Sequence, residues 1–566
     1  MPKSFFPLLL SAFFMAQSFH AGIAEPLTGD YANNARALLD PYVQSNLFSG
    51  AVLVAHDGKA IFRQAFGQAN REWDIANTSD TRFRLGSITK QFTATAILQL
   101  AEQHKLSIDD PVSKYYAEAP AAWQKITIKY LLTHSSGIPS YTDIPDFFKS
   151  DARIDRTPEE IVKLTRDKPL QFEPGSQFAY DNSGYVLLGY IIEKVSGESY
   201  ADYLQKHIFD PLGMHNSGYD SSTKIILRRA AGYENQDGEW VNGAFLSMSI
   251  PYAAGALYST ADDLLIWDQA LYAAKPLNDA SLKQMFTDYG HTYGFGWFID
   301  RKLEHNRISH GGSIKGFQAE IDRYPDDRLT IIVLSNFGNS PVDKISTDLA
   351  ALYFGVKAPV AITLSTEVLD HYVGQYELSP GIILKIKREG NRLFIQKPGQ
   401  SLIELFAKNE MEFFLKVADA QISFQTDDKG KVIGLINHQA GLDHLAKLVD
   451  ATEAAREENE LKRRVKDQAA QPGSEDALRR TIETMLHGEP NYDQMGLTVA
   501  AATRQQFPKL KPRLATLGAL QSISFKGVSP GGADIYEATF ANGLTEWRIL
   551  LGPDGKIVAL GFRPLS

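Results

Sequence analysis

Strand-forming segments at both ends of residues 30–355 constrain the fold more than any other feature of this sequence. Residues 50–67 contain two β-rich runs around Asp57-Gly58, which predict a hairpin. Further strand patterns return at 294–299, 319–324 and 329–335, with a helix expected near 341–354. Helical patterns and loops fill the long stretch between them. Strands from both ends with helices inserted between them predict an antiparallel sheet flanked by helices, in an α/β (α+β) domain.

The C-terminal part of the sequence divides into two smaller units. Residues 359–365 are expected to form a linker, and alternating strand patterns over 366–449 predict a small β-barrel domain. Residues 451–471 are strong helix formers of mixed charge and predict an exposed helical linker. Residues 474–566 show helices first and strands afterwards, which predicts an α+β domain of unknown role.

The N-terminus has the pattern of a secretory signal. Lys3 precedes an apolar stretch over 5–16, and small residues at 21–24 lead to the acidic Glu25. We expect cleavage near Ala24, which leaves 25–358 as the first folded domain; a retained N-terminal anchor is the alternative. Because no later stretch is apolar enough to span a bilayer, the mature chain is expected to have no transmembrane segment and to be periplasmic or extracellular.

Composition excludes several classes of function. The 566 residues include no Cys, so disulfides, thiolate metal sites and a Cys nucleophile are excluded. The formal net charge of -9 opposes binding to nucleic acid. The 13 His residues show no tight metal-ligand spacing. We therefore expect no metal, no cofactor and no nucleic-acid partner.

Ser87 and Lys90 are candidates for a catalytic pair at the start of an amphipathic run that extends to Leu106. A lysine three residues after a serine lies on the same helix face, where it can help to remove the hydroxyl proton. The spacing alone is weak evidence, because a chain of this length contains it about once or twice by chance. A second copy, Ser221 and Lys224, lacks a following helix pattern and is expected in a surface loop.

Two later segments could supply the other groups that acyl transfer needs, namely a proton carrier and N–H donors for an oxyanion. Tyr180-Asp181-Asn182 precedes a helix pattern, and His310-Gly311-Gly312-Ser313 precedes a strand pattern. Structural roles are the alternative: a core tyrosine at Tyr180, a helix cap at Asn182 and a turn histidine at His310. His134 is adjacent to two serines in the sequence, but adjacent residues do not face each other, so a structural role is expected for it.

The ordered motifs Ser-x-x-Lys, Tyr-x-Asn and His-x-Gly resemble those of the penicillin-recognising serine hydrolases, which include class C β-lactamases, DD-carboxypeptidases, D-aminopeptidases and related esterases. The resemblance covers roughly residues 30–355. It extends to 83–87, 131–137, 174–175, 255–264 and 293–297.

This resemblance implies a β-lactamase/transpeptidase-like fold and roles for seven residues. Ser87 would attack a carbonyl, while Lys90 and Tyr180 would move its proton. Asn182 would orient Lys90 and the substrate amide, and His310, Gly312 and Ser313 would belong to the substrate- and oxyanion-binding strand. The backbone N–H groups of Ser87 and Ser313 would form the oxyanion hole.

His310 departs from the β-lactamase pattern, in which lysine usually stands at this position. A lysine is a permanent point charge, whereas histidine is mostly neutral at pH 7. The favoured function is therefore an exported peptidase or esterase that acts on a small-molecule or peptide substrate of cell-wall type. A β-lactamase or DD-carboxypeptidase proper and a non-catalytic sensor of cell-wall fragments are the alternatives.

The resemblance also bears on the C-terminal units. Residues 366–449 are similar to the lipocalin-like domains that accompany some family members, and we expect one of their loops to narrow the active-site mouth. Oligomerisation through the C-terminal units is a further hypothesis.

Overall fold

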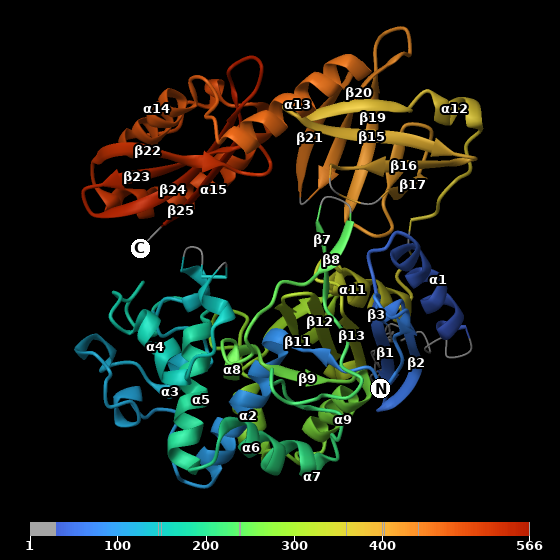
Figure 1. Ribbon diagram of the computed structural model, residues 1–566. Helices are drawn as coiled ribbons and strands as arrows, with labels where there is room; N and C mark the ends of the chain where they lie inside the picture. Colours follow the sequence, from blue (N-terminus) through green and yellow to red (C-terminus); the bar gives the residue numbers. More distant parts are fainter. Residues whose placement is uncertain are drawn as a thin grey trace, which may run out of the picture.

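The computed structural model describes residues 30–564, except 145, 146, 149, 237, 238, 358, 399, 401 and 440. The expected signal peptide, residues 1–24, lies outside the described residues. Figure 1 shows a large first part, a barrel above one side of it, and a C-terminal unit above the other side. Across the part of the chain that is described, none of the helices combines the length and the apolar character that a bilayer crossing requires.

The first part is built on a six-stranded sheet in the order β10-β11-β12-β13-β1-β2. β1 (Gly50–His56) and β2 (Lys59–Phe66) form the predicted hairpin, and β1 pairs antiparallel with β13 (Leu329–Ser335). The other strands are β10 (Phe298–Lys302), β11 (His305–Ile314) and β12 (Phe317–Tyr324). All neighbouring strands run antiparallel, which confirms the predicted sheet.

Two boundaries in this sheet differ from the sequence prediction. The strand expected at 294–299 begins only at Phe298, because a backbone hydrogen bond from Gly294 N–H to Trp297 O closes a turn just before it. His310 to Ser313 do not precede a strand but lie within β11. The motif therefore lies within the sheet rather than in a loop, in the part of β11 that pairs with β12 and extends beyond the end of β10.

Both faces of this sheet are covered by helices. Along β1, Val52 and Val54 pack with α1 (Tyr31–Gln44) and α11 (Val342–Tyr353). Leu53 points the other way into the main core, as the two-residue period of a strand requires. The helices of the first part are α2 (Thr89–Glu102), α3 (Ile128–Leu132), α4 (Pro158–Arg166), α5 (Asn182–Ser196), α6 (Tyr200–Leu204), α7 (Asp210–Leu212), α8 (Tyr252–Gly255), α9 (Ala261–Tyr272) and α10 (Asp279–Met285), and its short strands are β3 (Gln68–Asn70), β4 (Ile75–Ala76), β5 (Phe83–Arg84), β6 (Gly218–Tyr219), β7 (Tyr233–Gln236), β8 (Glu239–Asn242) and β9 (Leu257–Ser259).

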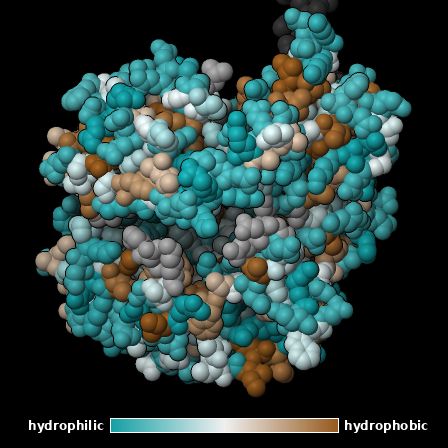
Figure 2. Space-filling view, turned by 45° about the horizontal axis from the view of Figure 1, so that its top comes forward, coloured by the Kyte–Doolittle hydropathy of each residue, from teal (hydrophilic) through white to brown (hydrophobic). Residues whose placement is uncertain are grey.

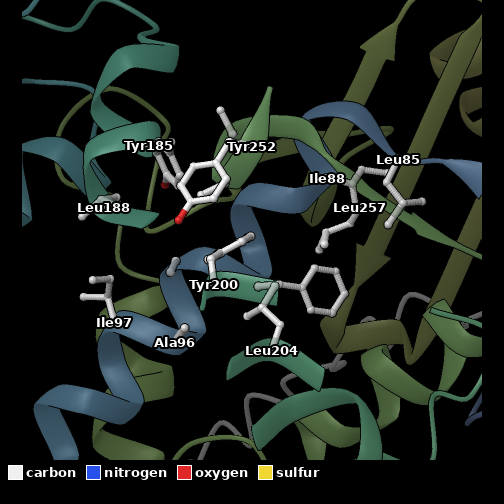
Figure 3. Close-up of a cluster of buried hydrophobic side chains, with 14 of the residues drawn as sticks. Leu85, Ile88, Ala96, Ile97, Tyr185, Leu188, Tyr200, Leu204, Tyr252 and Leu257 are labelled. Atoms are coloured by element: carbon white, nitrogen blue, oxygen red, sulfur yellow. The ribbon is translucent and has the colours of Figure 1, made fainter. Parts of the chain in front are cut away.

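The buried helix α2 organises the main core. Eleven of its 14 residues are buried, including polar Thr93 and Thr95, so it is covered on all sides rather than amphipathic. Figure 3 shows Ala96 and Ile97 of α2 among Leu188 of α5 and Leu204 of α6. A helix enclosed in this way holds its N-terminal turn in a fixed position.

The second part is a closed antiparallel barrel of eight strands, which confirms the predicted β-barrel. Its interior is filled by side chains, with the Tyr372 and Phe424 rings stacked at 4.2 Å. Eight-stranded barrels are just wide enough for such filling. The elements are α12 (Thr366–Asp370), β14 (Gly374–Ser379), β15 (Ile382–Glu389), β16 (Arg392–Gln396), β17 (Ile403–Ala407), β18 (Glu412–Phe414), β19 (Ala420–Thr426), β20 (Val432–Gln439) and β21 (Leu442–Val449).

The barrel contacts the first part beside α1. The Tyr42 hydroxyl donates to Lys416 O at 3.2 Å, and Val417 joins the core beneath α1 and α11. This contact joins the loop between β18 and β19 to the face of the sheet that α1 and α11 cover.

A helix joins the barrel to the C-terminal unit. α13 (Ala451–Asp467) occupies the predicted linker, but it is not simply exposed: Arg464 is buried and its guanidinium lies 2.6 Å from the buried Asp534 carboxylate. The last unit is α+β, as predicted, and consists of α14 (Ser474–His487), α15 (Leu497–Leu517) and a sheet of β22 (Leu520–Val528), β23 (Asp534–Phe540), β24 (Gly543–Leu551) and β25 (Ile557–Pro564).

The C-terminal unit lies on the side of the helical region, as Figure 1 shows. Burial raises the pKa of Asp143, in the helical region, and the positive charge of Arg563, in β25 of the C-terminal unit, acts to lower it.

Figure 2 shows a largely hydrophilic face, with a hollow across its middle.

Candidate active site

Ser87 lies on a 3₁₀ turn, Gly86–Ile88, immediately before α2. Leu85 and Ile88, on either side of it, are buried with Leu257 of β9 in the core that Figure 3 shows. Ser87 itself remains partly exposed. The turn is therefore anchored on both sides while the Ser87 hydroxyl stays accessible. The regular helix α2 begins at Thr89, two residues later than the sequence predicts.

Lys90 is fully buried in the first turn of α2 and makes three hydrogen bonds. Its Nζ lies 3.1 Å from Ser87 Oγ, 2.8 Å from Asn182 Oδ1 and 2.9 Å from Ala254 O. The Asn182 and Ala254 oxygens can only accept. When Lys90 is neutral, its two protons go to these oxygens and its lone pair faces Ser87, so the geometry sets the serine up to lose a proton.

The pKa of Lys90 fits this arrangement. Burial lowers the pKa to about 7, and the negative charge of Asp181 offsets only part of this effect. A lysine with this pKa is partly neutral near neutral pH and can accept a proton there.

Tyr180 and Asn182 come from the turn that begins α5. Asp181 is the N-cap residue, and its carboxylate accepts the Gly184 N–H at 3.0 Å. The Asn182 amide is held on its other side, because Nδ2 donates to Thr142 Oγ1 at 3.2 Å. Asn182 is the first residue of α5 and not its N-cap, so the capping alternative is wrong for Asn182, whose side chain instead links Lys90 to the wall of the site.

Tyr180 is half-buried beside Lys90, whose Nζ lies 4.8 Å from the ring centroid, and its hydroxyl oxygen is enclosed. Burial raises the pKa of the phenol, which the nearby Ser87 hydroxyl lowers in part. The phenolic oxygen has no well-formed hydrogen bond to any residue the structure describes. Tyr180 is therefore a neutral phenol in the free enzyme, with a proton to give.

Asp181 is the titratable group that sequence reasoning missed. Burial raises the pKa of its carboxyl to about 7, while hydrogen bonds from backbone N–H groups lower it in part. Its position between two motif residues was the only available signal. The Ala254 carbonyl could not have been found, because a backbone acceptor leaves no trace in residue type.

The backbone of β11 passes very close to the Ser87 turn. A Cβ added to Gly312 would lie 1.9 Å from Leu85 O and 3.3 Å from the Ser87 backbone nitrogen, while one added to Gly86 would lie 2.8 Å from the Ser313 nitrogen. Only glycine permits this approach. The two backbone N–H groups expected to bind an oxyanion, those of Ser87 and Ser313, therefore lie in adjoining segments.

His310 belongs to this strand and is buried, with both ring nitrogens engaged. Gly311 O accepts from Nδ1 at 2.6 Å, so Nδ1 carries the proton and Nε2 accepts from the Tyr293 hydroxyl at 3.0 Å. Burial lowers the pKa of His310 to about 3, and the charge of Lys90 contributes to this. His310 is therefore neutral and presents no cation to a substrate.

The second Ser-x-x-Lys copy lies away from these groups. Ser221 and Lys224 belong to a loop between β6 and β7, where Ser221 Oγ lies 2.9 Å from Thr223 Oγ1 and Lys224 is exposed. The predicted surface position of this copy is correct.

Comparison with known proteins identifies the family to which this constellation belongs. A family model described as "Beta-lactamase" matches residues 35–354, which is more than half of the chain. The chain belongs to the beta-lactamase family. A second model, a domain of unknown function (DUF3471), matches residues 358–456.

Several relatives of this beta-lactamase family member have informative names. Penicillin-binding protein 4* of Bacillus subtilis is 31% identical over 425 residues, which cover 69% of this chain and 92% of the relative. Teichoic acid D-alanine hydrolase of Staphylococcus aureus is 29% identical over 54% of this chain and 74% of its own length. The solved octameric penicillin-binding protein homologue from Pyrococcus abyssi is 27% identical, covers 73% of this chain and 99% of its own, and has a TM-score of 0.54. This family member is accordingly a serine hydrolase.

Proposed function

We propose that this chain is an exported peptidase or esterase that cleaves an ester or amide bond through an acyl-enzyme on Ser87. One observation carries the proposal: Lys90 Nζ contacts Ser87 Oγ and two acceptor-only oxygens, and its pKa is lowered to about 7. A neutral lysine in this position can activate the serine.

The proposed reaction assigns a step to each group. Ser87 Oγ bonds to the substrate carbonyl carbon while its proton passes to Lys90 Nζ, and the carbonyl oxygen becomes an oxyanion beside the Ser87 and Ser313 N–H groups. The carbonyl bond to the leaving group then breaks, and Tyr180 supplies a proton to that group. Lys90 returns the serine proton to the Tyr180 phenolate. Water then attacks the carbonyl carbon of the acyl-enzyme. The proton transfers run in the reverse order, so that Ser87 Oγ recovers its proton as the acid leaves.

The substrate class follows from His310 and the relatives. A neutral, doubly hydrogen-bonded His310 offers no charge for a substrate carboxylate, which favours an acyl donor without one at this position. The relative named teichoic acid D-alanine hydrolase supports a D-alanyl ester or a similar cell-wall derivative. We therefore place small D-amino acyl esters and amides first among the substrates.

A β-lactamase or DD-carboxypeptidase activity is the second candidate. The name of penicillin-binding protein 4* favours it, whereas His310 disfavours it. A non-catalytic sensor is the third, and the close contact between Ser87 and Lys90 argues against it.

The organisation of the chain enters this proposal as well. We propose a signal peptide at 1–24, a hydrolase domain at 25–358, a lipocalin-like domain at 366–449, a helical linker at 451–471 and an α+β domain at 474–566, with a periplasmic or extracellular location. We also propose assembly through the C-terminal units, and the octameric homologue from Pyrococcus abyssi supports the assembly itself.

A plate assay tests the reaction. Wild type, Ser87→Ala and the matched control Ser221→Ala are compared on p-nitrophenyl esters, D- and L-alanyl p-nitroanilides and nitrocefin. We expect turnover by wild type and by Ser221→Ala, with loss in Ser87→Ala, and a preference for esters or D-anilides over nitrocefin. Fluorophosphonate labelling that survives Ser87→Ala would exclude the proposed nucleophile.

A further inference from the structure

A buried histidine outside the predicted constellation holds the segment that carries Tyr180. His134 follows α3 with a φ of +53°, a left-handed conformation that is uncommon for residues other than glycine and that His, Asn and Asp adopt more readily than most. Its carbonyl oxygen accepts the Ala179 N–H at 3.0 Å, and its Nδ1 accepts the Asp181 N–H at 3.0 Å. The two bonds bracket Tyr180 from both sides along the chain.

The imidazole also packs directly on the Tyr180 ring. The two ring centroids lie 4.3 Å apart with planes inclined by 35°. Tyr185 at 5.1 Å and Tyr293 at 4.9 Å surround the same imidazole. Because His134 is fully buried in this aromatic surround, its ring can neither turn nor move away from the phenol.

The hydrogen bond from Asp181 also fixes the protonation of His134. Since Nδ1 accepts, the proton of the neutral ring is on Nε2, which has no partner among the described residues. Burial lowers the pKa of His134 well below its ordinary value, and the charge of Lys90 adds to this effect. The His134 imidazole is therefore neutral, and its basic nitrogen, Nδ1, already accepts the Asp181 N–H, so it does not serve as an alternative base for Ser87.

We propose that His134 is a positioning residue that fixes the Tyr180 phenol for proton delivery to the leaving group. This inference rests on the proposed acyl-enzyme function. In that reaction the bond from the carbonyl carbon to the leaving oxygen or nitrogen breaks, and the Tyr180 proton goes to that atom. A displaced phenol would leave nucleophilic attack possible but would slow the departure of a basic leaving group.

The leaving group therefore provides the test. An alkyl ester needs a proton on its departing alkoxide, whereas a p-nitrophenyl ester of the same acid releases a stable phenolate without one. We expect His134→Ala to lower kcat/KM, which reports acylation, by about 10–100-fold for the alkyl ester and much less for the nitrophenyl ester, since a misplacement of about 1 Å can cost 10²-fold. Tyr180→Phe should show the same selectivity, and KM should change little in either variant.

Two further variants separate positioning from simple destabilisation. His134→Asn keeps an acceptor for the Asp181 N–H and tolerates positive φ, so it should recover part of the alkyl-ester rate. Because His134→Asn also lacks the imidazole ring, the two ester rates can be compared in this variant if His134→Ala does not fold. Tyr200→Phe removes a buried hydrogen bond to Thr93 away from this turn and should leave the ratio of the two rates unchanged.

Rates are normalised to the sites titrated by fluorophosphonate. The inference is overturned if His134→Ala slows both esters by one common factor, or slows neither. A wild type that hydrolyses neither ester and takes no label would instead contradict the proposed function itself.

Discussion

Lys90 Nζ and Asn182 Oδ1 lie 2.8 Å apart, and this bond joins the first turn of α2 to the first turn of α5. The two helices are far apart in the sequence but meet at the predicted nucleophile. Because Asn182 is also held by Thr142, it keeps the lysine amine directed at Ser87.

The first prediction concerns the pH dependence of turnover. If neutral Lys90 is the base, kcat/KM should rise with pH as Lys90 loses its proton and should level off above an apparent pKa near 7. Stopped-flow or plate assays of a nitrophenyl ester between pH 5 and 9 measure this limb. Lys90→Arg should be inactive across the range, since a guanidinium does not deprotonate. A flat profile from pH 5 to 8 would contradict the role of Lys90.

The second concerns Asp181→Asn. The negative charge of Asp181 raises the pKa of Lys90, so its removal should lower that pKa and move the acidic limb to lower pH by about 0.5–1 unit. An asparagine keeps an oxygen to cap α5. The same pH profile measures the shift, with Asp202→Asn, at the exposed start of α6, as the control. A shift to higher pH would show that the two groups do not interact as inferred.

The third concerns the approach of β11 to the Ser87 turn. Gly312→Ala would place a Cβ 1.9 Å from Leu85 O, so it must push the strand from the turn. We expect a loss of about 10²-fold or more in kcat, as for the loss of an oxyanion donor. Gly531→Ala is the matched control, because an added Cβ there meets open space. Full activity in the Gly312 variant would argue against the oxyanion site.

The fourth concerns His310→Lys, which restores the residue usual in β-lactamases. The site is buried, its nitrogens are engaged with Tyr293 and Gly311, and Lys90 is nearby. We expect a lower Tm and no gain in nitrocefin hydrolysis, because a second ammonium would be desolvated beside the first. Efficient nitrocefin turnover by this variant would show that the single residue separates the two activities.

The fifth concerns the helix that joins the barrel to the C-terminal unit. Arg464→Met leaves the buried Asp534 carboxylate without its cation and should destabilise the C-terminal unit by about 3–5 kcal/mol. The adjacent Arg463→Met removes an exposed pair with Glu460 and should change stability by less than about 1 kcal/mol. Urea unfolding, with limited proteolysis of residues 474–564, compares the two. Equal stability of both variants would contradict the burial of Arg464.

Local patterns in the sequence determined much of the architecture. Strand-forming runs located β1, β2, β12, β13 and the four C-terminal strands, because a strand buried on one face alternates apolar and polar residues, whereas one buried on both faces, such as β13, is a short continuous apolar run. The order of Ser87, Tyr180 and His310 with their neighbours indicated the family that the comparisons then showed. The spacing of Ser87 and Lys90 places them one turn apart once the segment is helical, which its own pattern predicted.

The tertiary structure decided what could not be read from these patterns. The sequence could not predict that the Ala254 carbonyl faces Lys90, that Tyr293 and Gly311 occupy both nitrogens of His310, or that Arg464 is buried. Each of these contacts depends on packing between segments that are distant in the chain. A backbone carbonyl, or an arginine in a charged helical segment, gives no local sequence pattern that reveals its partner. Burial also sets the chemistry: residue type assigns Lys90 an ordinary pKa, and only its enclosure within the helical core lowers that pKa to about 7.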